Sequence, residues 1–506
     1  MTVLTSFRAS LPLPPSCRPS LPALVNSLWR AAPAISHGVR AVATAASSVT
    51  LSRQRINQLL EGEITHFALK AQRPLDFQQI INIRNIQETA RFLHAELPVR
   101  FANRIRSLEE LPGWRSIPAL VDVRTSYVES FKDLRLVAVD DRSDFRAALQ
   151  RVKQRHGKVV QLLTTGLRDL QHARPLELSP TFVDAFLNEF FLSRIGTELI
   201  REQYMTVERS NGRGSGIIDP ECAPLEVITR AARDAGRLCD YHTQSAPTVQ
   251  LFTPRLMTSP LRFAFVSRYL YYVVFELLKN SMRAVSEKGP AADESDLHSG
   301  EGARRPTYEL EGTNTRLPPV RVVLAGDSET MHIKVSDRGG GIPLALQPKI
   351  WSYLYTTATP AHVKVSHTGI DGPATTNGNG VPPLAGFGVG LPLSNLYTQY
   401  FGGRLRLVSL PGFGTDAYVQ LPGLLGNVQE KVARGWEPIR AGNQDANAAV
   451  PSYAGVSLHY PTAPVLLGSW QERPVGESRQ SSLDMSGELV NDEWGRRDII
   501  AAAAVA

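Results

Sequence analysis

The residues best placed to do chemistry lie in the stretch FELLKNSMRA, residues 275–284. Glu276, Asn280 and Arg283 recur at helical spacing, so a helix would present all three on one face. The apolar residues would face a core on the other side: Phe275, Leu278, Met282 and Val285. The polar stripe would then line something wet or charged, although a solvated helix face would carry the same residues.

Three glycine-rich segments follow this stretch. Asp337 opens DRGGGI at the end of a strand pattern, where a carboxylate can accept a hydrogen bond from the exocyclic amine of adenine. GFGVGL, residues 386–391, runs into a helix pattern, so its N–H groups and the helix end would cradle phosphate. GFGTD, residues 412–416, is a hairpin turn that would place Thr415 beside the base. Each cluster alone indicates only a turn, but the ordered set indicates a nucleotide site.

Two kinds of element must position these residues. From residue 51 to about 206 apolar residues recur three and four apart, which predicts long helices in an antiparallel bundle; one helix ends at His156-Gly157. After residue 246 a helix is predicted over 262–286, with strands over 320–324, 331–337, 404–409 and 416–421 and a helix over 391–401. This mixture is an α+β sandwich, with one layer of helices and one of mostly antiparallel strands.

The amino-acid composition limits the class of protein and the number of domains. The 506 residues are 42% hydrophobic and 20% charged, as in a soluble protein of two or three domains, and no apolar run reaches the length of a membrane span. Three scattered cysteines fit neither a disulfide framework nor a zinc site, and indicate a reducing compartment. From about residue 426 the chain is rich in Ala, Gly, Asn, Ser and Pro, which predicts an extended or disordered tail with short docking elements at most.

The N-terminus carries arginines without acids. Residues 1–60 hold six arginines and no Asp or Glu, in a context rich in Ser, Ala and Leu, which is typical of a mitochondrial presequence. A disordered basic tail is the alternative. Cleavage near Ser48 would remove four arginines and lower the formal charge from +7 to +3, which is too little for a nucleic-acid footprint.

The ordered motifs resemble those of the GHKL (Bergerat-fold) superfamily, and more closely the mitochondrial 2-oxo-acid dehydrogenase kinases that act on the pyruvate and branched-chain complexes. Four segments of the C-terminal half carry the resemblance: ELLKNSMRA, YTTATP, LAGFGVGLPLSNLYTQYFGG and GFGTDAYVQL. Three segments of the helical half add to it: PLDFQQII, FLHAELPVRFANRIRSLEELP and FRAALQRVKQRHGKVVQLLTTGL. It extends over residues 51–421 and implies four regions: a presequence (1–48), a regulatory bundle (49–245), a GHKL ATP-binding domain (246–424) and the tail (425–506).

The resemblance also implies roles. Glu276 would be the general base for the acceptor serine, Asn280 the Mg²⁺ ligand, and Asp337 the reader of the adenine amine. Lys279 and Arg283 would either stabilise charge or be structural. The other expected ATP-binding residues are Gly339 and Gly341 under the base, Thr356 and Thr357 by the lid, Gly386, Phe387, Gly388, Val389, Gly390 and Leu391 around the triphosphate, and Thr415.

The implied protein is a homodimeric serine kinase of the mitochondrial matrix. It would use ATP and Mg²⁺ to phosphorylate and inactivate the E1α subunit of a 2-oxo-acid dehydrogenase complex, with pyruvate dehydrogenase favoured over the branched-chain complex, and would dock on the lipoyl-bearing E2 subunit. Neither nucleic acid nor a membrane span is expected.

Four residues depart from the family pattern. Tyr272 stands where a His is expected, four residues before the base, and leaves the tuning of that base open. Glu198 replaces an Arg in the bundle and puts an anionic effector site there in doubt, while Tyr204 and Asn395 replace a His and an Arg.

Three other readings stay open from the residues alone. An ATPase would use Glu276 to activate water instead of serine. A histidine kinase would need a phospho-acceptor such as His94 in FLHAELP, although no receiver or sensor domain is visible. A nucleotide-binding scaffold is disfavoured by the intact Glu276, Asn280 and Asp337.

Overall fold

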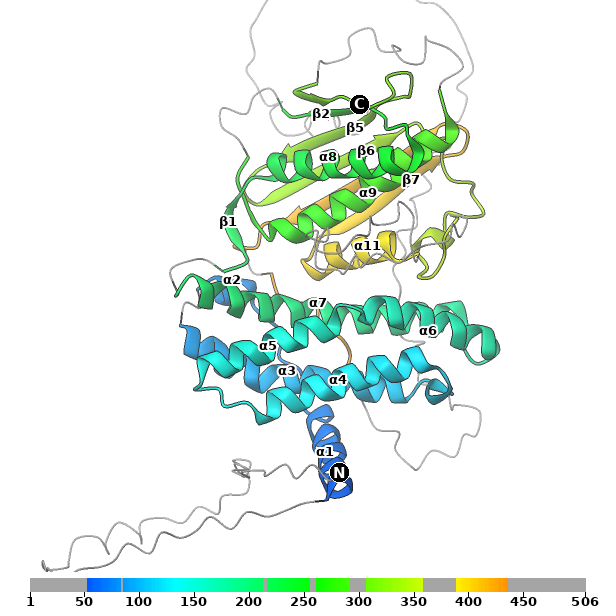
Figure 1. The fold of residues 1–506 in the computed structure, drawn as a ribbon. Helices are drawn as coiled ribbons and strands as arrows, with labels where there is room; N and C mark the ends of the chain where they lie inside the picture. The colour runs from blue at the N-terminus through cyan, green and yellow to red at the C-terminus, as the bar shows by residue number, and fades with distance from the viewer. Residues whose placement is uncertain are drawn as a thin grey trace, which may run out of the picture. The chain divides into compact units, whose positions relative to one another are not determined.

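The N-terminal half is a bundle of helices in the computed structural model (Figure 1). The structure describes residues 52–82, 85–212, 216–254, 261–290, 306–357, 388–426 and 428–435, so the predicted presequence and most of the predicted tail lie outside it. The elements of this half are α1 (Arg53–Ala68), α2 (Phe77–Asn82), α3 (Ile86–Glu109), the 3-10 turn η2 (Trp114–Ser116), α4 (Pro118–Leu136), α5 (Arg142–His156), α6 (Val159–Ala173) and α7 (Pro180–Arg209).

Local sequence sets the ends of these helices. Ser179 caps α7 by accepting a hydrogen bond from the Phe182 amide at 3.2 Å, and Pro180 occupies the first helical position. Asp141 caps α5 in the same way, and that helix ends at His156 as its sequence predicts. α7 is buried along much of its length, including charged residues at its centre, because it packs on α3 on one side and on the C-terminal half on the other (Figure 1).

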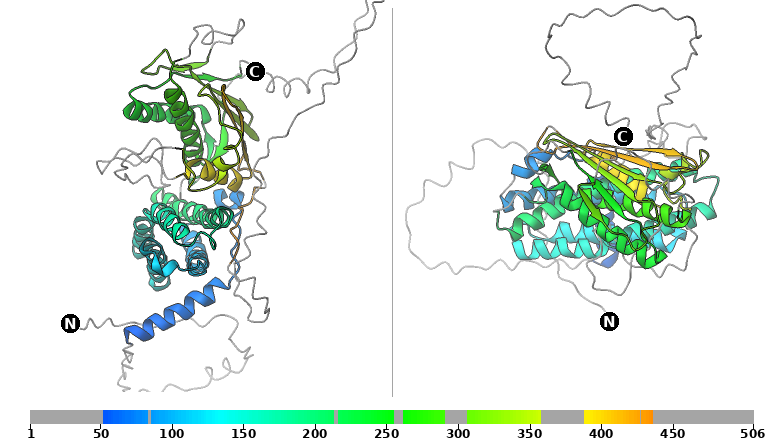
Figure 2. Two further views of the ribbon diagram at one scale, coloured as in Figure 1. Left: turned by 90° about the vertical axis from the view of Figure 1, so that its right-hand side faces the viewer. Right: turned by 90° about the horizontal axis from the view of Figure 1, so that it is seen from above.

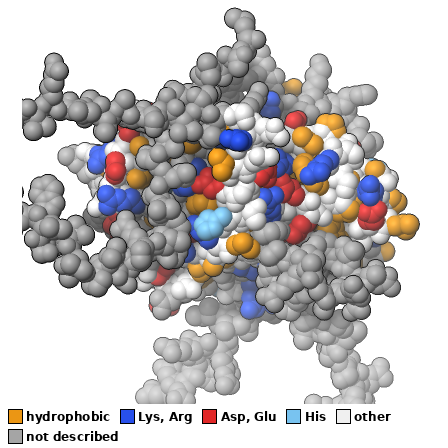
Figure 3. Space-filling model, turned by 90° about the horizontal axis from the view of Figure 1, so that it is seen from below, with side chains coloured by type: hydrophobic (Ala, Val, Ile, Leu, Met, Phe, Trp, Pro, Cys, Tyr) orange, Lys and Arg blue, Asp and Glu red, His pale blue; other side chains and the backbone are white. Residues whose placement is uncertain are grey.

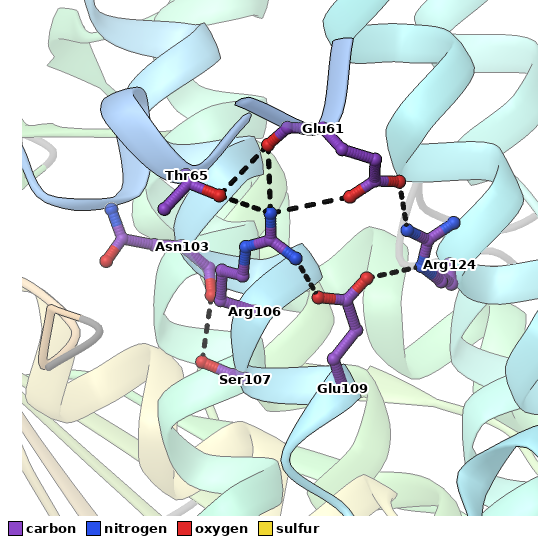
Figure 4. Close-up of polar contacts among 7 residues, drawn as sticks. All are labelled: Glu61, Thr65, Asn103, Arg106, Ser107, Glu109 and Arg124. Atoms are coloured by element: carbon purple, nitrogen blue, oxygen red, sulfur yellow. Dashed lines mark hydrogen bonds and ion pairs between the residues drawn. The ribbon is translucent and has the colours of Figure 1, made fainter. Parts of the chain in front are cut away.

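A polar network fastens α1 to α3 and α4 (Figure 4). Arg106 donates to the Glu61 carbonyl at 3.0 Å and to the Thr65 hydroxyl at 2.6 Å. Arg124 bridges two acids, at 2.6 Å from Glu61 and 2.6 Å from Glu109. Because α1 projects from the remaining helices in Figure 1, these bonds fix a helix that has few neighbours of its own.

The C-terminal half is a mixed sheet covered by helices. Its main sheet has the strand order β4-β2-β5-β6-β8-β7, parallel only between β2 and β5, while β1 pairs with β3 in a separate ribbon. The elements are β1 (Asp219–Cys222), α8 (Pro224–Thr243), β2 (Val249–Phe252), β3 (Phe263–Phe265), α9 (Ser267–Lys288), β4 (Tyr308–Leu310), β5 (Val320–Gly326), β6 (Thr330–Asp337), η3 (Lys349–Trp351), α11 (Gly390–Tyr400), β7 (Arg404–Leu410) and β8 (Gly414–Pro422).

The helices of this half cover one face of the sheet (Figure 2). Met331, Ile333 and Val335 of β6 point into the resulting core, whereas Lys334 lies on the opposite face and pairs with Asp416 at 3.0 Å. The α+β sandwich expected from the sequence is therefore confirmed.

Two predicted boundaries need correction. The helix expected over 262–286 begins only at Ser267, because residues 263–265 form β3 and pair with β1. The bundle was expected to extend to residue 245, but α8 packs along α9 on the sheet. An amphipathic helix carries the same periodicity in either setting, so periodicity could not assign α8 to its half.

The chain beyond the last strand returns to the bundle. Gln429 forms an isolated antiparallel bridge with Asp76, in the connection between α1 and α2. The Arg104 side chain donates to the carbonyl of Arg434 at 2.9 Å. Residues 428–435, at the start of the predicted tail, are therefore extended and docked on the helices.

In the described part of the chain, no helix has the length and apolarity needed to cross a bilayer. On the face drawn in Figure 3, acidic and basic side chains are interspersed among apolar ones and form no single-sign patch.

Candidate active site

The acid–amide helix of the sequence is α9, and its carboxylate points at the glycine loop. Glu276 is 9% exposed, and a Cβ built on Gly390 would lie 2.2 Å from its Oε2. Lys279 Nζ donates to Glu276 Oε1 at 2.7 Å, and both side chains are nearly buried. Asn280 is exposed on the same side, one turn further along. Glu276 of the predicted stripe thus lies at the first turn of α11, whereas Asn280 remains accessible to solvent.

The apolar side of α9 carries it on the sheet. Leu278, Met282 and Val285 are fully buried, as the spacing predicts. Phe275 is only partly buried and stacks on Tyr271 at the edge of this face. Arg283, predicted to touch the nucleotide, donates to Glu287 at 2.7 Å, a contact that fits its structural reading.

Asp337 ends β6 at the other side of the site. Register pairs it with Thr415 of β8, so the predicted base-reading acid and its predicted neighbour are brought together by the sheet. The carboxylate is 8% exposed and accepts hydrogen bonds from the Ser281 hydroxyl at 2.9 Å and the Gly339 amide at 2.9 Å. Burial raises the pKa of Asp337 above its ordinary value, despite these bonds.

Two glycines behind Asp337 are required for packing. A Cβ on Gly339 would lie 2.5 Å from the Cβ of Ala284 on α9, and one on Gly341 would lie 2.1 Å from the Leu410 carbonyl. Gly341 also has a φ of 69°, which disfavours other residues. The sequence predicts that these glycines allow a base to approach closely. In the structure, a side chain at Gly339 would meet α9 and one at Gly341 would meet the β7–β8 turn.

The predicted phosphate-binding loop, residues 386–391, is described from Gly388 onward, and Gly386 and Phe387 lie outside the described residues. Gly388 has a φ of 72°, and a Cβ there would lie 2.5 Å from the Tyr355 carbonyl. Val389 precedes α11, whose first-turn amides at Gly390 and Leu391 have no intrahelical acceptor and face the direction from which an anion would bind.

Thr356 and Thr357 are exposed and directly follow the turn at residues 352–355. That segment is tied to the loop, because the Leu354 amide donates to the Gly388 carbonyl at 3.1 Å. The two predicted lid residues, Thr356 and Thr357, therefore directly follow a turn that is hydrogen-bonded to the glycine loop.

Residues that the motifs did not indicate complete the surroundings. Ser281, which donates to Asp337, lies within the same stretch as Glu276, yet nothing in its spacing marked it. Tyr272 packs its ring on Tyr397 at 5.0 Å between centroids. Burial and the nearby Glu276 raise the pKa of Tyr272 well above its ordinary value, so a neutral phenol stands at the position of the expected His.

The two bundle residues that depart from the family pattern, Glu198 and Tyr204, are both buried. Glu198 pairs with Arg201 at 2.7 Å, both nearly inaccessible to solvent. Tyr204 is fully buried and packs edge-on against Phe145. The negatively charged Glu198 is therefore buried in the bundle beside Arg201.

Asn395, the remaining departure, lies within α11 in the C-terminal half, and its carbonyl accepts a hydrogen bond from Thr398.

His94 does not suit a phospho-acceptor. Its Nε2 is buried without a hydrogen-bond partner among the described residues, and its ring faces Phe145 in the bundle. Burial lowers the pKa of His94. A phosphoryl acceptor has to be presented to solvent, so this geometry disfavours the histidine-kinase reading.

A buried acid on a helix, a second acid closing a central strand and a glycine loop opening a helix define an ATP-binding domain of the GHKL class. Comparison with known families agrees: residues 266–424 match the histidine kinase-, DNA gyrase B- and HSP90-like ATPases. Residues 68–220 match the mitochondrial branched-chain alpha-ketoacid dehydrogenase kinase family.

Individual relatives are similar over most of their length. The chain is 35% identical over 355 residues to the mitochondrial pyruvate dehydrogenase (acetyl-transferring) kinase of Arabidopsis thaliana, covering 69% of this chain and 87% of that one. It is 31% identical to human isozyme 4 and 29% identical to human isozyme 1, covering 74% and 77% of this chain and 87% of each isozyme. The chain belongs to this family of mitochondrial kinases and is an ATP-dependent protein serine kinase.

Proposed function

We propose that this kinase phosphorylates, and thereby inactivates, the E1α subunit of the pyruvate dehydrogenase complex in the mitochondrial matrix. One observation carries the proposal: the Glu276 carboxylate lies against Gly390, at the end of α11 where a triphosphate would be held. A buried carboxylate at that point suits an acceptor that must lose a proton as it attacks.

In the proposed reaction, the serine oxygen attacks the γ-phosphorus while Glu276 takes the hydroxyl proton. The bond from the γ-phosphorus to the β–γ bridging oxygen breaks, and ADP leaves with that electron pair. Lys279, which donates to Glu276 at 2.7 Å, would hold the carboxylate in position. The new phosphate adds roughly −1.5 to −2 charges to E1α, enough to displace a loop that binds an anionic cofactor or substrate.

Asn280 fits a magnesium site of the kind this family uses. Its amide is exposed one turn from Glu276, and Mg²⁺ prefers oxygen ligands and needs few from the protein when phosphates supply the others. No group of three or more His, Cys, Asp or Glu side chains suited to a metal occurs among the described residues, so the nucleotide would provide most ligands. Bound Mg²⁺ would neutralise charge on the transferring phosphoryl group.

The choice of complex rests on the relatives. Those reported above are pyruvate dehydrogenase kinases, whereas the family matched by residues 68–220 is named for the branched-chain complex. Identity with the pyruvate enzymes extends over both halves of the chain, which favours pyruvate dehydrogenase. Docking on the lipoyl-bearing E2 subunit and homodimer formation are part of the same proposal.

Phosphate labelling tests the proposal. The full chain without residues 1–48 is incubated with γ-labelled ATP, Mg²⁺ and purified E1 from each complex. We expect acid-stable label on a serine of pyruvate dehydrogenase E1α, and no label when Mg²⁺ is chelated. Acid-labile label on the kinase itself would support the histidine kinase, and free phosphate without labelled protein would support the ATPase. Stronger labelling of the branched-chain E1 would reverse the choice of complex.

The matrix location is tested separately. Residues 1–48 fused to a fluorescent protein should enter mitochondria, and changing Arg8, Arg18, Arg30 and Arg40 together to Glu should abolish import. Protease protection after outer-membrane rupture would place the fusion in the matrix. Cytosolic residence of the unaltered fusion would contradict this part of the proposal.

A further inference from the structure

A buried carboxylate of the bundle reaches into the C-terminal half. Asp184, in the first part of α7, is 3% exposed. Its Oδ1 accepts a hydrogen bond from the Tyr353 amide at 2.7 Å, and its Oδ2 accepts one from the Ser352 hydroxyl at 2.7 Å. Neither contact follows from any motif, because the two segments lie far apart in the chain.

The next turn of α7 adds to this attachment. Asn188 lies four residues after Asp184, on the same side of the helix, and its Oδ1 accepts a bond from the Tyr353 hydroxyl at 2.8 Å. The Tyr353 ring also contacts Phe191 at 5.5 Å between centroids. Backbone, hydroxyl and ring of Tyr353 are thus all fixed by one face of α7, and the tyrosine is 4% exposed.

From this attachment, short contacts lead to the general base. The amide after Tyr353 belongs to Leu354, which has a φ of 65° and donates to the Gly388 carbonyl at 3.1 Å. A leucine with positive φ costs on the order of 1–3 kcal/mol unless its surroundings impose it. Gly388 is two residues before Gly390, whose backbone abuts the Glu276 carboxylate.

We propose that Asp184 is a positioning residue for phosphoryl transfer. By fixing Ser352 and Tyr353 on the bundle, it holds Leu354 in its strained conformation and sets the position of Gly388, and so of Gly390 against Glu276. It touches neither substrate nor nucleotide. The inference rests on the proposed role of Glu276, and it makes the bundle a determinant of the rate of transfer, beyond any role in docking.

Hydrogen-bond chemistry separates this role from general stability. In Asp184→Ala both acceptors disappear. In Asp184→Asn the amide oxygen can still accept from Tyr353, and the amide nitrogen can donate to Ser352, whose hydroxyl is both donor and acceptor. The conservative variant should therefore rescue function, whereas Asp184→Asn with Ser352→Ala leaves the new amide donor without this partner.

The matched control is Val183→Ala. Val183 neighbours Asp184 on α7 and is 2% exposed, so its truncation weakens the bundle core without removing a contact to Ser352 or Tyr353. An equal loss of activity in Asp184→Ala and Val183→Ala would mean that Asp184 acts only through the stability of the fold.

The experiment measures two quantities on the full chain without residues 1–48. One is the steady-state rate of γ-phosphoryl loss from ATP, whichever acceptor takes it, resolved into kcat and KM. The other is hydrogen exchange at the Leu354 amide, which reports its bond to Gly388 directly. The adenine contacts at Asp337 do not depend on Asp184, so KM for ATP should change less than about threefold.

We expect Asp184→Ala to lower kcat at least tenfold and to accelerate exchange at Leu354, since small misplacements near the reacting groups can cost up to about 10²-fold in rate. Asp184→Asn should stay within about threefold of the unaltered chain, and Val183→Ala should leave exchange at Leu354 unchanged. If Asp184→Ala does not fold, Ser352→Ala tests the link from the other side, with a smaller loss of kcat and faster exchange.

Unchanged kcat in folded Asp184→Ala, or an equal loss in Val183→Ala, would overturn the proposal. Its failure is distinguishable from failure of the proposed function. Absence of E1α labelling in the unaltered chain contradicts the substrate, while exchange at Leu354 and ATP turnover still decide the role of Asp184.

Discussion

Glu430, eight residues beyond the end of β8, places its carboxylate 2.6 Å from the guanidinium of Arg100 on α3, and both side chains are 1% exposed. Burial alone would lower the pKa of Arg100, but its bonds to Glu430 and the nearby Glu96 raise it instead. Tyr400, at the last turn of α11, is fully buried and lies close enough to Arg100 and Glu430 to interact with their charges. α11, which starts at the predicted phosphate-binding loop, therefore ends beside an ion pair that joins the bundle to the segment after β8.

Breaking this pair should loosen the connection between the two halves. Glu430→Ala leaves buried Arg100 with Glu96 and the carbonyl of Arg73 as partners, and loss of one partner of a buried pair typically costs about 3–5 kcal/mol. Urea unfolding should show a loss of this order, and hydrogen exchange should accelerate over residues 428–435. A loss below about 1 kcal/mol would mean that the pair is dispensable.

Gly196 provides an independent check on the same pair. A Cβ there would lie 2.1 Å from Glu430 and 2.2 Å from Arg100, so Gly196→Ala should destabilise the unaltered chain. In the Glu430→Ala background the contact with Glu430 disappears while the contact with Arg100 remains, so Gly196→Ala should still destabilise the chain, but by less than in the unaltered chain. Equal effects of Gly196→Ala in both backgrounds would contradict the packing described here.

Replacing Glu276, the proposed general base, should separate ATP binding from phosphoryl transfer. Glu276→Gln keeps the shape of the side chain and removes its basicity, so the rate of transfer should fall by about 10²- to 10⁴-fold. ATP affinity measured by calorimetry should change little. Near-normal transfer in a variant that binds ATP would show that Glu276 has another role.

The close contact at Gly390 predicts a second way to disturb the same carboxylate. A methyl group at Gly390 would lie 2.2 Å from Glu276, so Gly390→Ala should lower kcat sharply. Gly236, on α8, has no atom within 4 Å of an added Cβ, and Gly236→Ala is the matched control, expected to leave kcat unchanged. In the Glu276→Gln background, Gly390→Ala should cost little more, because the base is already lost. Fully additive losses would place the two residues in separate roles.

Asp337→Ala should weaken ATP binding itself. Loss of the acceptor would leave the adenine amine unpaired in a buried site, at a cost of about 1–3 kcal/mol in binding free energy. Calorimetry with ATP and with a nucleotide that lacks the exocyclic amine is the measurement. The variant should lose the preference for ATP that the unaltered chain shows, and an unchanged preference would place the adenine contact elsewhere.

Acid should destabilise the bundle from an unusually high pH. Burial and the charge of Arg194 lower the pKa of His156 from 6.5 to about 3, so the unfolded chain takes up a proton that the folded chain refuses. The free energy of unfolding therefore falls as the pH drops through 6.5, and at pH 5.5 it should be about 1.4 kcal/mol lower than at pH 7.5.

Glu198 acts in the same direction at lower pH. Burial would raise its pKa, but Arg201 and Arg194 lower it from 4.5 to about 2, so its contribution to stability is lost as pH falls below 4.5.

Urea unfolding tests the role of His156. Between pH 7.5 and 5.5 the free energy of unfolding of His156→Gln should depend less on pH than that of the unaltered chain. An identical pH dependence would exclude His156 as the cause.

The local parts of the candidate site could be predicted from the amino-acid sequence. The spacing of Glu276 and Asn280, the acid before the glycines at 337 and the glycine loop before a helix each depend on helix and turn geometry within a few residues. The same holds for the main strands and for the end of α5 at His156. These features are local, and the residue types alone constrain them.

The contacts between distant segments could be read only from the tertiary structure. The pairing of Asp337 with Thr415 needed the β6–β8 register, and the placement of α8 needed its packing on α9. The attachment of Asp184 to Tyr353 and of Glu430 to Arg100 depends on how segments from the two halves of the chain pack against each other. A buried carboxylate is stable only with donors around it, yet its own sequence neighbourhood does not reveal which distant donors those will be.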